Sequence, residues 1–101
     1  MKQEEREELL DQIDKDNPIE LEDEERSIVL APREIFDSAI IGYENKRVVY
    51  SEEAIIQIYM KEDGMTLEEA IDFYEFNTKC AYMGKYNPIY KSENYEEELW
   101  N

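Results

Sequence analysis

Apolar residues in the second half of the chain recur at helical spacing. In residues 52–63, EEAIIQIYMKED, the side chains that share one helix face are Ala54, Ile55, Ile58 and Tyr59. Ser51 precedes this run as an N-cap, and Gly64 follows it in the position where a helix ends in a left-handed residue. The pattern therefore predicts a helix over 52–63.

A second helix is predicted to begin at Leu67, after a capping box formed by Thr66 and Glu69, and to run to Gly84. Together with the first helix it forms an αα-hairpin. One of its faces holds Leu67, Ala70, Ile71, Tyr74, Thr78 and Ala81, and the other holds Phe73, Phe76, Asn77 and Cys80. A helix that is apolar on two faces is expected to be central, packed by a sheet and by another helix.

This interpretation makes Asn77 a buried amide that bonds a turn, and Cys80 an inert core thiol. The segment 70–90, AIDFYEFNTKCAYMGKYNPIY, holds aromatic residues, an amide and a thiol, and so resembles a reactive site in composition. Because the chain contains no histidine, the commonest base that activates a thiol is missing, and we expect Cys80 to be unreactive. We therefore expect the segment to be scaffold, followed by a turn at Asn87-Pro88.

The first half of the domain predicts strands. Residues 27–31, SIVLA, are expected to form a short strand, and Pro32 to be the first residue of a helical turn. The β-rich runs 39–43 and 47–51 flank ENK, which predicts a hairpin with Asn45 at positive φ. Within that hairpin, Gly42 indicates a bulge or a close backbone approach.

The N-terminal region predicts a short helix over residues 3–14, whose narrow apolar stripe is Leu9, Leu10 and Ile13. Residues 14–26 are too charged to be core, and they are expected to be a linker or a poorly ordered arm. The fold class is α+β, with a small β-hairpin or sheet packed against the αα-hairpin. We divide the chain into an acidic helix and arm (1–26), a single α+β domain (27–92) and an acidic aromatic tail (93–101).

Net charge changes this picture most, because the 101 residues carry a formal charge of −16. Residues 1–26 hold twelve acidic and four basic residues, and residues 93–101 hold four acidic and none basic. Such a charge argues against direct binding to nucleic acid or to an anionic membrane, and it favours a basic protein partner. The alternative is that the acid only keeps the protein soluble.

Catalytic chemistry finds little support in the sequence. No spacing marks an acid–base pair among the 27 acidic residues, and no phosphate-binding loop appears. Residues 14–25 place acids as an EF-hand loop does, but Ile19 stands where that loop needs glycine. We expect no catalytic residue, no cofactor and no metal site. No apolar run approaches a membrane span and the N-terminus is acidic, so a cytoplasmic protein is expected.

The acidic ends are the candidate binding surface. Carboxylates one helical turn apart are spaced on the order of phosphates along a strand, so they would suit a groove that binds nucleic acid. Tyr and Trp dominate interface hot spots, so we also include the two aromatic residues of the tail in the candidate binding surface. The candidate partner-binding residues are Glu4, Glu5, Glu7, Glu8, Asp11, Glu22, Asp23, Glu24, Glu25, Tyr95 and Trp100.

Three stretches resemble a family of small uncharacterised bacteriophage proteins: IIGYENKRVVYSEEAI, EDGMTLEEAIDFYEFN and AYMGKYNPI. The resemblance covers residues 40–90, and it implies a phage origin and an α+β fold but no activity. Small, strongly acidic phage proteins often resemble inhibitors of host nucleases, CRISPR effectors and other DNA-processing enzymes, and by analogy with them we expect an inhibitor. The leading hypothesis is therefore a non-catalytic, nucleic-acid-mimicking inhibitor. The alternative is a structural or assembly module, with a homodimer as one form of it.

Overall fold

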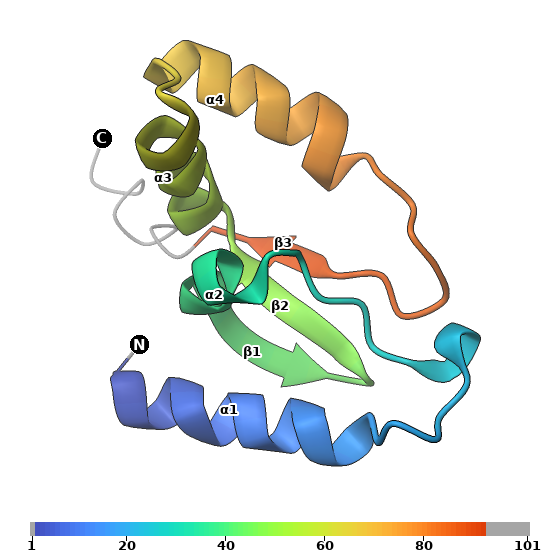
Figure 1. Cartoon of the computed structure of the whole chain (residues 1–101). Coiled ribbons are helices and arrows are strands. Elements are labelled where there is room, and N and C mark those ends of the chain that lie inside the picture. Colours follow the sequence, from blue (N-terminus) through green and yellow to red (C-terminus); the bar gives the residue numbers. More distant parts are fainter. Residues whose placement is uncertain (1, 93–101) are drawn as a thin grey trace.

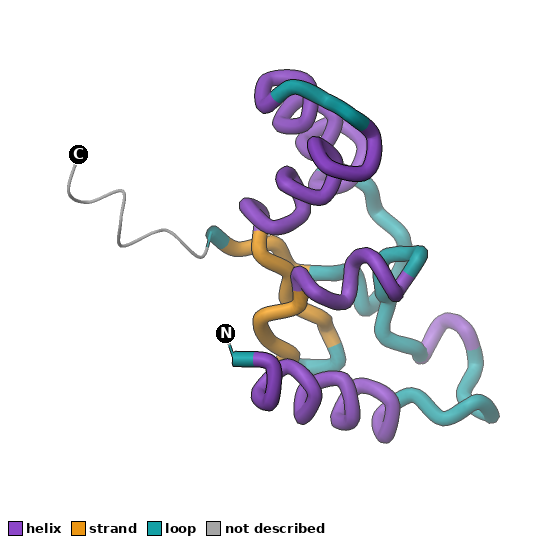
Figure 2. Tube along the Cα trace, turned by 60° about the vertical axis from the view of Figure 1, so that its left-hand side comes forward, coloured by secondary structure: helices purple, strands orange, loops and turns teal. Residues whose placement is uncertain are grey.

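A three-stranded sheet lies at the centre of the α+β fold, with helices on both sides of it (Figures 1 and 2). The computed structural model describes residues 2–92. The strands are β1 (Ile40–Glu44), β2 (Arg47–Ser51) and β3 (Ile89–Lys91), in the order β1-β2-β3. Strand β2 is antiparallel to β1 and parallel to β3. The α+β class expected from the sequence is confirmed.

Strands β1 and β2 form the predicted hairpin around a two-residue turn. Asn45 and Lys46 both have positive φ, 52° and 63°, as a tight hairpin turn requires. The register shifts between Ile40 and Gly42, and a Cβ atom added to Gly42 would lie 3.3 Å from Cβ of Val49. Gly42 thus lies at a bulge and also allows a close strand approach, so both interpretations of this glycine are confirmed.

Helices α3 (Glu52–Asp63) and α4 (Leu67–Phe73) form the predicted αα-hairpin. The Ser51 hydroxyl accepts a hydrogen bond from the Ala54 amide at 3.1 Å, and Gly64 ends α3 in the left-handed conformation. Thr66 and Glu69 make the reciprocal capping box. The predicted caps are therefore confirmed. They could be predicted because each depends on residues that are close in sequence.

The helix that begins at Leu67 is shorter than predicted. Beyond α4 it continues with π-helical bonding as η3 (Tyr74–Lys79) and then ends, so the extension to Gly84 is wrong. The Asn87 side chain takes up the next backbone groups, accepting from the Met83 amide at 2.9 Å and donating to the Ala81 carbonyl at 3.3 Å. Gly84 has φ 152°, and its Cα faces Ile28 too closely for a side chain.

The segment 27–31 is extended but is not a strand, so that prediction is wrong. Its Ile28 amide donates to the Tyr86 carbonyl, while its Leu30 amide donates to the Tyr50 hydroxyl instead of to a neighbouring strand. Strand β2 is already paired on both edges, by β1 and by β3. The short strand β3 was not anticipated, because nothing local in IYK indicates pairing with a strand 40 residues earlier.

Helix α1 and three short elements complete the fold. Helix α1 (Gln3–Asp16) is confirmed and is two residues longer than expected. The 3-10 turn η1 (Asp23–Glu25) interrupts the linker. Helix α2 (Arg33–Phe36) continues into the turn η2 (Asp37–Ala39), and Pro32 is the N-cap of α2, one position before its predicted place.

The core lies where α1, the sheet and the αα-hairpin meet. Helix α1 packs against β1, α3 packs against β2, and α4 packs against α3. Ile13 of α1 is only 2% exposed and belongs to the same core cluster as the strands. The buried members are Ile13, Phe36, Ala39, Ile40, Val48, Tyr50, Ile55, Tyr59, Ala70 and Tyr74.

Candidate interaction surfaces

One face of the α4–η3 segment is open to solvent, which corrects the prediction of a central, doubly packed helix. Asn77 and Cys80 are exposed, and Phe76 is 76% exposed. The predicted roles of Asn77 as a buried tie and of Cys80 as core are therefore wrong. Helix α4 packs on α3, and on this face Phe73 contacts Tyr59 of α3, whereas Phe76, Asn77 and Cys80 face solvent. Asn87, not Asn77, is the amide that ties a turn.

The buried face of the same segment is held by polar contacts as well as by packing. The Tyr74 hydroxyl donates to Oε1 of Glu52 at 2.7 Å, and the Tyr59 hydroxyl bonds Oγ1 of Thr78. Lys79 lies 3.0 Å from the same Glu52 carboxylate, whose hydrogen bond and charge raise the pKa of Lys79. Burial, and then the bond to Glu52, raise the pKa of Tyr74. These contacts fix which face the segment turns outward.

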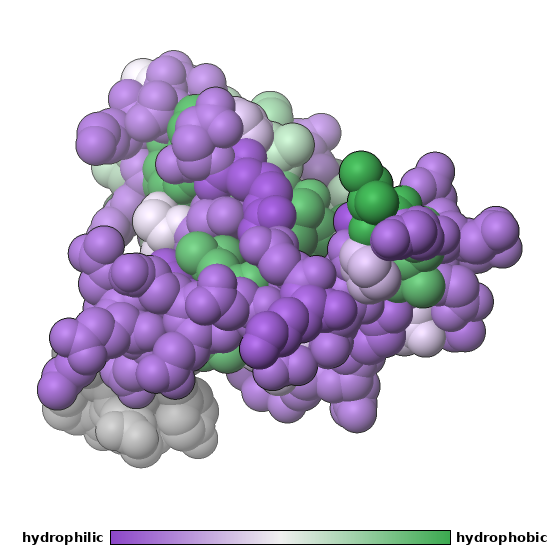
Figure 3. All heavy atoms as spheres, turned by 60° about the horizontal axis from the view of Figure 1, so that its bottom comes forward, coloured by the Kyte–Doolittle hydropathy of each residue, from purple (hydrophilic) through white to green (hydrophobic). Residues whose placement is uncertain are grey.

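Helix α1 displays the predicted acidic face. Glu4, Glu7, Glu8 and Asp11 are exposed, whereas Glu5 is occupied in capping the helix through a 3.0 Å bond from the Lys2 amide. On its inner side Ile13 is buried in the core, and Nε of Arg6 donates to the Ile40 carbonyl of β1 at 3.2 Å. Figure 3, which brings the α1 side of the molecule forward, shows mostly hydrophilic residues over this face.

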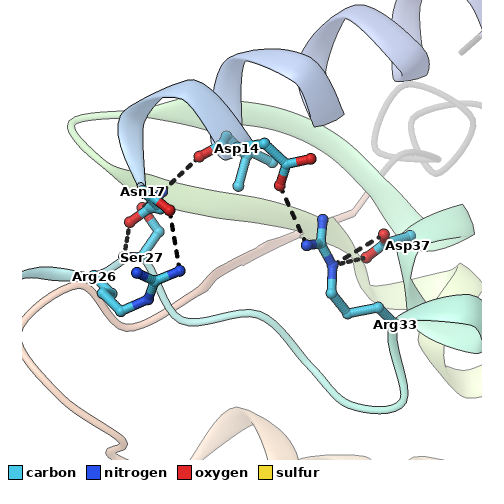
Figure 4. Close-up of polar contacts among 7 residues, drawn as sticks. Asp14, Asn17, Arg26, Ser27, Arg33 and Asp37 are labelled. Atoms are coloured by element: carbon cyan, nitrogen blue, oxygen red, sulfur yellow. Dashed lines mark hydrogen bonds and ion pairs between the residues drawn. The ribbon is translucent and has the colours of Figure 1, made fainter. Parts of the chain in front are cut away.

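The C-terminal end of α1 is fastened by an arginine that bridges two aspartates (Figure 4). Arg33 lies 3.3 Å from Asp14 of α1 and 3.2 Å from Asp37 of η2. Burial alone would lower the pKa of Arg33, but the bonds and charges of Asp37 and Asp14 outweigh it, so that the pKa is raised. Arg33 thereby joins α1 to η2.

The linker after α1 is also tied down. The Asn17 side chain accepts from the Ser27 amide at 2.6 Å and donates to the Ile13 carbonyl at 2.7 Å (Figure 4). Arg26 donates to the carbonyls of Asn17 and Pro18. Of the two alternatives for residues 14–26, these bonds favour a bonded linker over a poorly ordered arm. The three-segment division of the chain itself stays a prediction.

The second group of predicted residues lies in and beside η1. Glu22, Asp23 and Glu24 are exposed, whereas Glu25 is half-buried. The Glu25 carboxylate lies 3.9 Å from Nζ of Lys85, and its backbone carbonyl accepts from Lys46. Figure 1 places η1 beyond the C-terminal end of α1, away from the start of that helix. The acids thus form two groups, one along α1 and one at η1, while Tyr95 and Trp100 lie outside the described residues.

Within residues 2–92, no group of three or more His, Cys, Asp or Glu side chains is arranged to hold a metal ion. Over the same range, every helix is too short or too polar to cross a membrane. No protein-family model, no curated protein and no solved structure matches this chain. The resemblance to small bacteriophage proteins therefore stays a prediction, and function has to be inferred from the surfaces themselves.

Proposed function

We propose that the protein is a non-catalytic binding protein that blocks the basic, nucleic-acid-binding surface of a partner protein. The observation that carries the proposal is the mounting of α1. An acidic segment that serves only solubility needs no fixed position, whereas this helix is docked by Ile13, Arg6 and the bridge from Asp14 to Arg33. Its carboxylates are thereby presented in a fixed arrangement.

The spacing of those carboxylates suits a surface that binds phosphates. Glu4 and Glu8 follow each other at four-residue separation, which is about 6 Å along a helix axis and of the order of phosphate spacing on one strand. A docked helix needs no further ordering of its backbone on binding, and complementary charge speeds association. The exposed acids at η1 extend the negative surface beyond the end of the helix.

The resemblance to small bacteriophage proteins narrows the proposed partner to a host protein that acts on nucleic acid, such as a defence nuclease or a CRISPR effector. The place of action would then be the host cytoplasm. Such an inhibitor needs no chemistry of its own, since it only competes with the natural ligand of its target.

The test is capture of basic nucleic-acid-binding proteins from bacterial lysate on the immobilised full chain. The α1 variant carries Glu4→Gln, Glu7→Gln, Glu8→Gln and Asp11→Asn. A control variant of equal charge carries Glu20→Gln, Glu34→Gln, Glu68→Gln and Glu75→Gln, all exposed positions outside α1. We expect about tenfold weaker capture by the α1 variant and little change with the control, because four interfacial charges are lost only in the first.

Two further readouts decide whether the capture reflects mimicry. Competing duplex DNA should release the captured protein, and the affinity should fall steeply between about 50 mM and about 200 mM salt. Affinity that is flat over this range, or equal loss in both variants, contradicts the proposal. Capture that survives in the α1 variant favours the alternative of an assembly module.

A further inference from the structure

An apolar groove lies between α2, α3 and η3. It has a volume of about 330 Å³. Its apolar lining comes from the segment before α2, from α2 and α3, and from the chain after η3: Leu30, Pro32, Ile35, Phe36, Ile58 and Met83. No residue of α1 lines this groove, and the αα-hairpin lies away from α1 in Figures 1 and 2, so the groove and the acidic helix face are separate surfaces.

Phe73 divides the groove from a second, more open hollow. Both hollows include Phe73 and Asn77 in their lining, and the second is completed by Met65 and Phe76. The Phe73 ring is held edge-on against Tyr59, with centroids 4.9 Å apart at 72°. Phe76 is 76% and Met83 44% exposed. Large apolar side chains gathered around a fixed aromatic ridge are typical of a binding surface.

The charged residues that line this surface are all acidic. Glu62 and Asp63 line the first hollow, Glu69 and Asp72 line the second, and no Lys or Arg lines either. Residues 52–79 hold eight acidic and two basic residues, and one of the two, Lys79, is paired with Glu52. The rest of the 27–92 region holds three acidic and five basic residues. The acid of the domain is therefore concentrated on the hairpin that forms this surface.

We propose that the groove binds an amphipathic, basic segment of a partner protein. The apolar side chains of that segment enter the two hollows on either side of Phe73, and its Lys or Arg residues pair with the four rim carboxylates. This is recognition of a helix or extended peptide by a groove, with charge setting the specificity. The proposal does not rest on the function assigned to α1, because it concerns a different face.

Charge also argues against the two occupants that the chain itself could supply. A second copy would bring its own acidic rim and a net charge of −16 to the interface. Residues 93–101 hold four acidic residues and no basic one. Like charges brought together at an interface oppose binding, whereas a basic segment gains both apolar burial and ion pairing.

The probe is a labelled synthetic helical peptide with Leu and Phe on one face and Lys on the other, titrated with the full chain by fluorescence anisotropy. A second peptide keeps every Lys and replaces the apolar residues with Ser. We expect the first peptide to bind at least about tenfold more tightly than the second. The double variant Phe76→Ser, Met83→Ser should lose about tenfold in affinity, since both side chains are exposed and their loss leaves the core intact.

Matched controls separate the groove from general acidity. Leu67→Ser removes an apolar side chain that is 55% exposed on the same hairpin but lines neither hollow, and it should leave binding unchanged. The α1 charge variant should also bind the peptide normally. The peptide titration therefore tests the groove proposal separately from the proposed function of α1. Glu62→Gln with Asp72→Asn should weaken binding and reduce its dependence on salt.

Several results would overturn the proposal. Equal affinity for the two peptides, or unchanged affinity in the Phe76→Ser, Met83→Ser variant, would show that only bulk charge is recognised. A dimer in sedimentation equilibrium that becomes a monomer on Phe76→Ser would assign the groove to a second copy. Markedly tighter peptide binding by Trp100→Ala would assign it to the chain's own C-terminal segment.

Discussion

Three tyrosines meet at the junction of the sheet and the αα-hairpin: Tyr50 and Tyr74 are buried, and Tyr90 is half-buried. The Tyr90 ring stacks on Tyr50 at 6.1 Å and meets Tyr74 edge-on at 5.7 Å. The Tyr50 hydroxyl accepts a 2.8 Å bond from the Leu30 amide, and burial raises the pKa of Tyr50 to about 12. The Tyr90 hydroxyl is buried with no hydrogen-bond partner among residues 2–92. The hydroxyl groups of Tyr50 and Tyr90 are therefore expected to affect stability differently.

Replacing Tyr50 and Tyr90 separately by phenylalanine should distinguish the hydroxyl that accepts a hydrogen bond from the hydroxyl that makes none. Tyr50→Phe leaves the Leu30 amide without its acceptor, and should lower the free energy of unfolding by about 1–3 kcal/mol. Tyr90→Phe removes a polar atom that makes no bond, and should be neutral or stabilising by up to about 1 kcal/mol. Urea unfolding of both variants at one pH measures the difference. Equal destabilisation would contradict the assignment of the Tyr90 hydroxyl as unpaired.

At the scale of elements, α1 depends on its docking and not on its own propensity. A helix of this length with like charges along one face is marginal in isolation. Its stability comes mainly from Ile13 in the core, with smaller contributions from Arg6 at β1 and from the partly exposed bridge of Arg33 to Asp14. The helix that carries the proposed binding face should therefore unfold together with the domain.

Ile13→Ala is the direct test of this coupling. Ile13 is 2% exposed, so the variant should lose about 2–5 kcal/mol of stability through lost burial and a residual cavity. Ile19→Ala is the matched control, because Ile19 is 91% exposed and its loss should change stability by less than about 0.5 kcal/mol. Chemical denaturation followed by far-UV circular dichroism should show one transition. Loss of α1 helicity in Ile13→Ala before global unfolding would mean that α1 is an independent arm.

The same scale explains which parts of the fold the sequence could predict. The caps at Ser51, Gly64 and Thr66 and the turn at Asn45 depend on neighbouring residues, and all are found. Strand β3 depends on pairing with a distant strand and leaves no local signal. The face of Phe73, Phe76, Asn77 and Cys80 was identified by its spacing. Spacing states which residues share a face, however, and not whether another element covers it.

At the scale of the whole molecule, repulsion among acids opposes folding. The chain has 27 acidic and 11 basic residues, and the five ion pairs within residues 2–92 all join partly exposed side chains. Exposed pairs contribute little, whereas a large net charge destabilises a compact state. Docking α1 adds to this cost, because it holds an acidic helix against a domain that is itself negative.

Salt should therefore stabilise the fold while it weakens the proposed binding. Raising NaCl from about 10 mM to about 150 mM shortens the Debye length from about 30 Å to about 8 Å, which screens repulsion between the acidic surfaces. We expect the free energy of unfolding to rise by on the order of 1 kcal/mol, measured as an increase in the urea midpoint. The α1 charge variant should start more stable and respond less to salt. Stability that falls with salt would show that the ion pairs outweigh repulsion. Screening also weakens attraction to a basic partner. If added salt stabilises the fold and weakens binding, and both effects shrink in the α1 charge variant, the same carboxylates cause both.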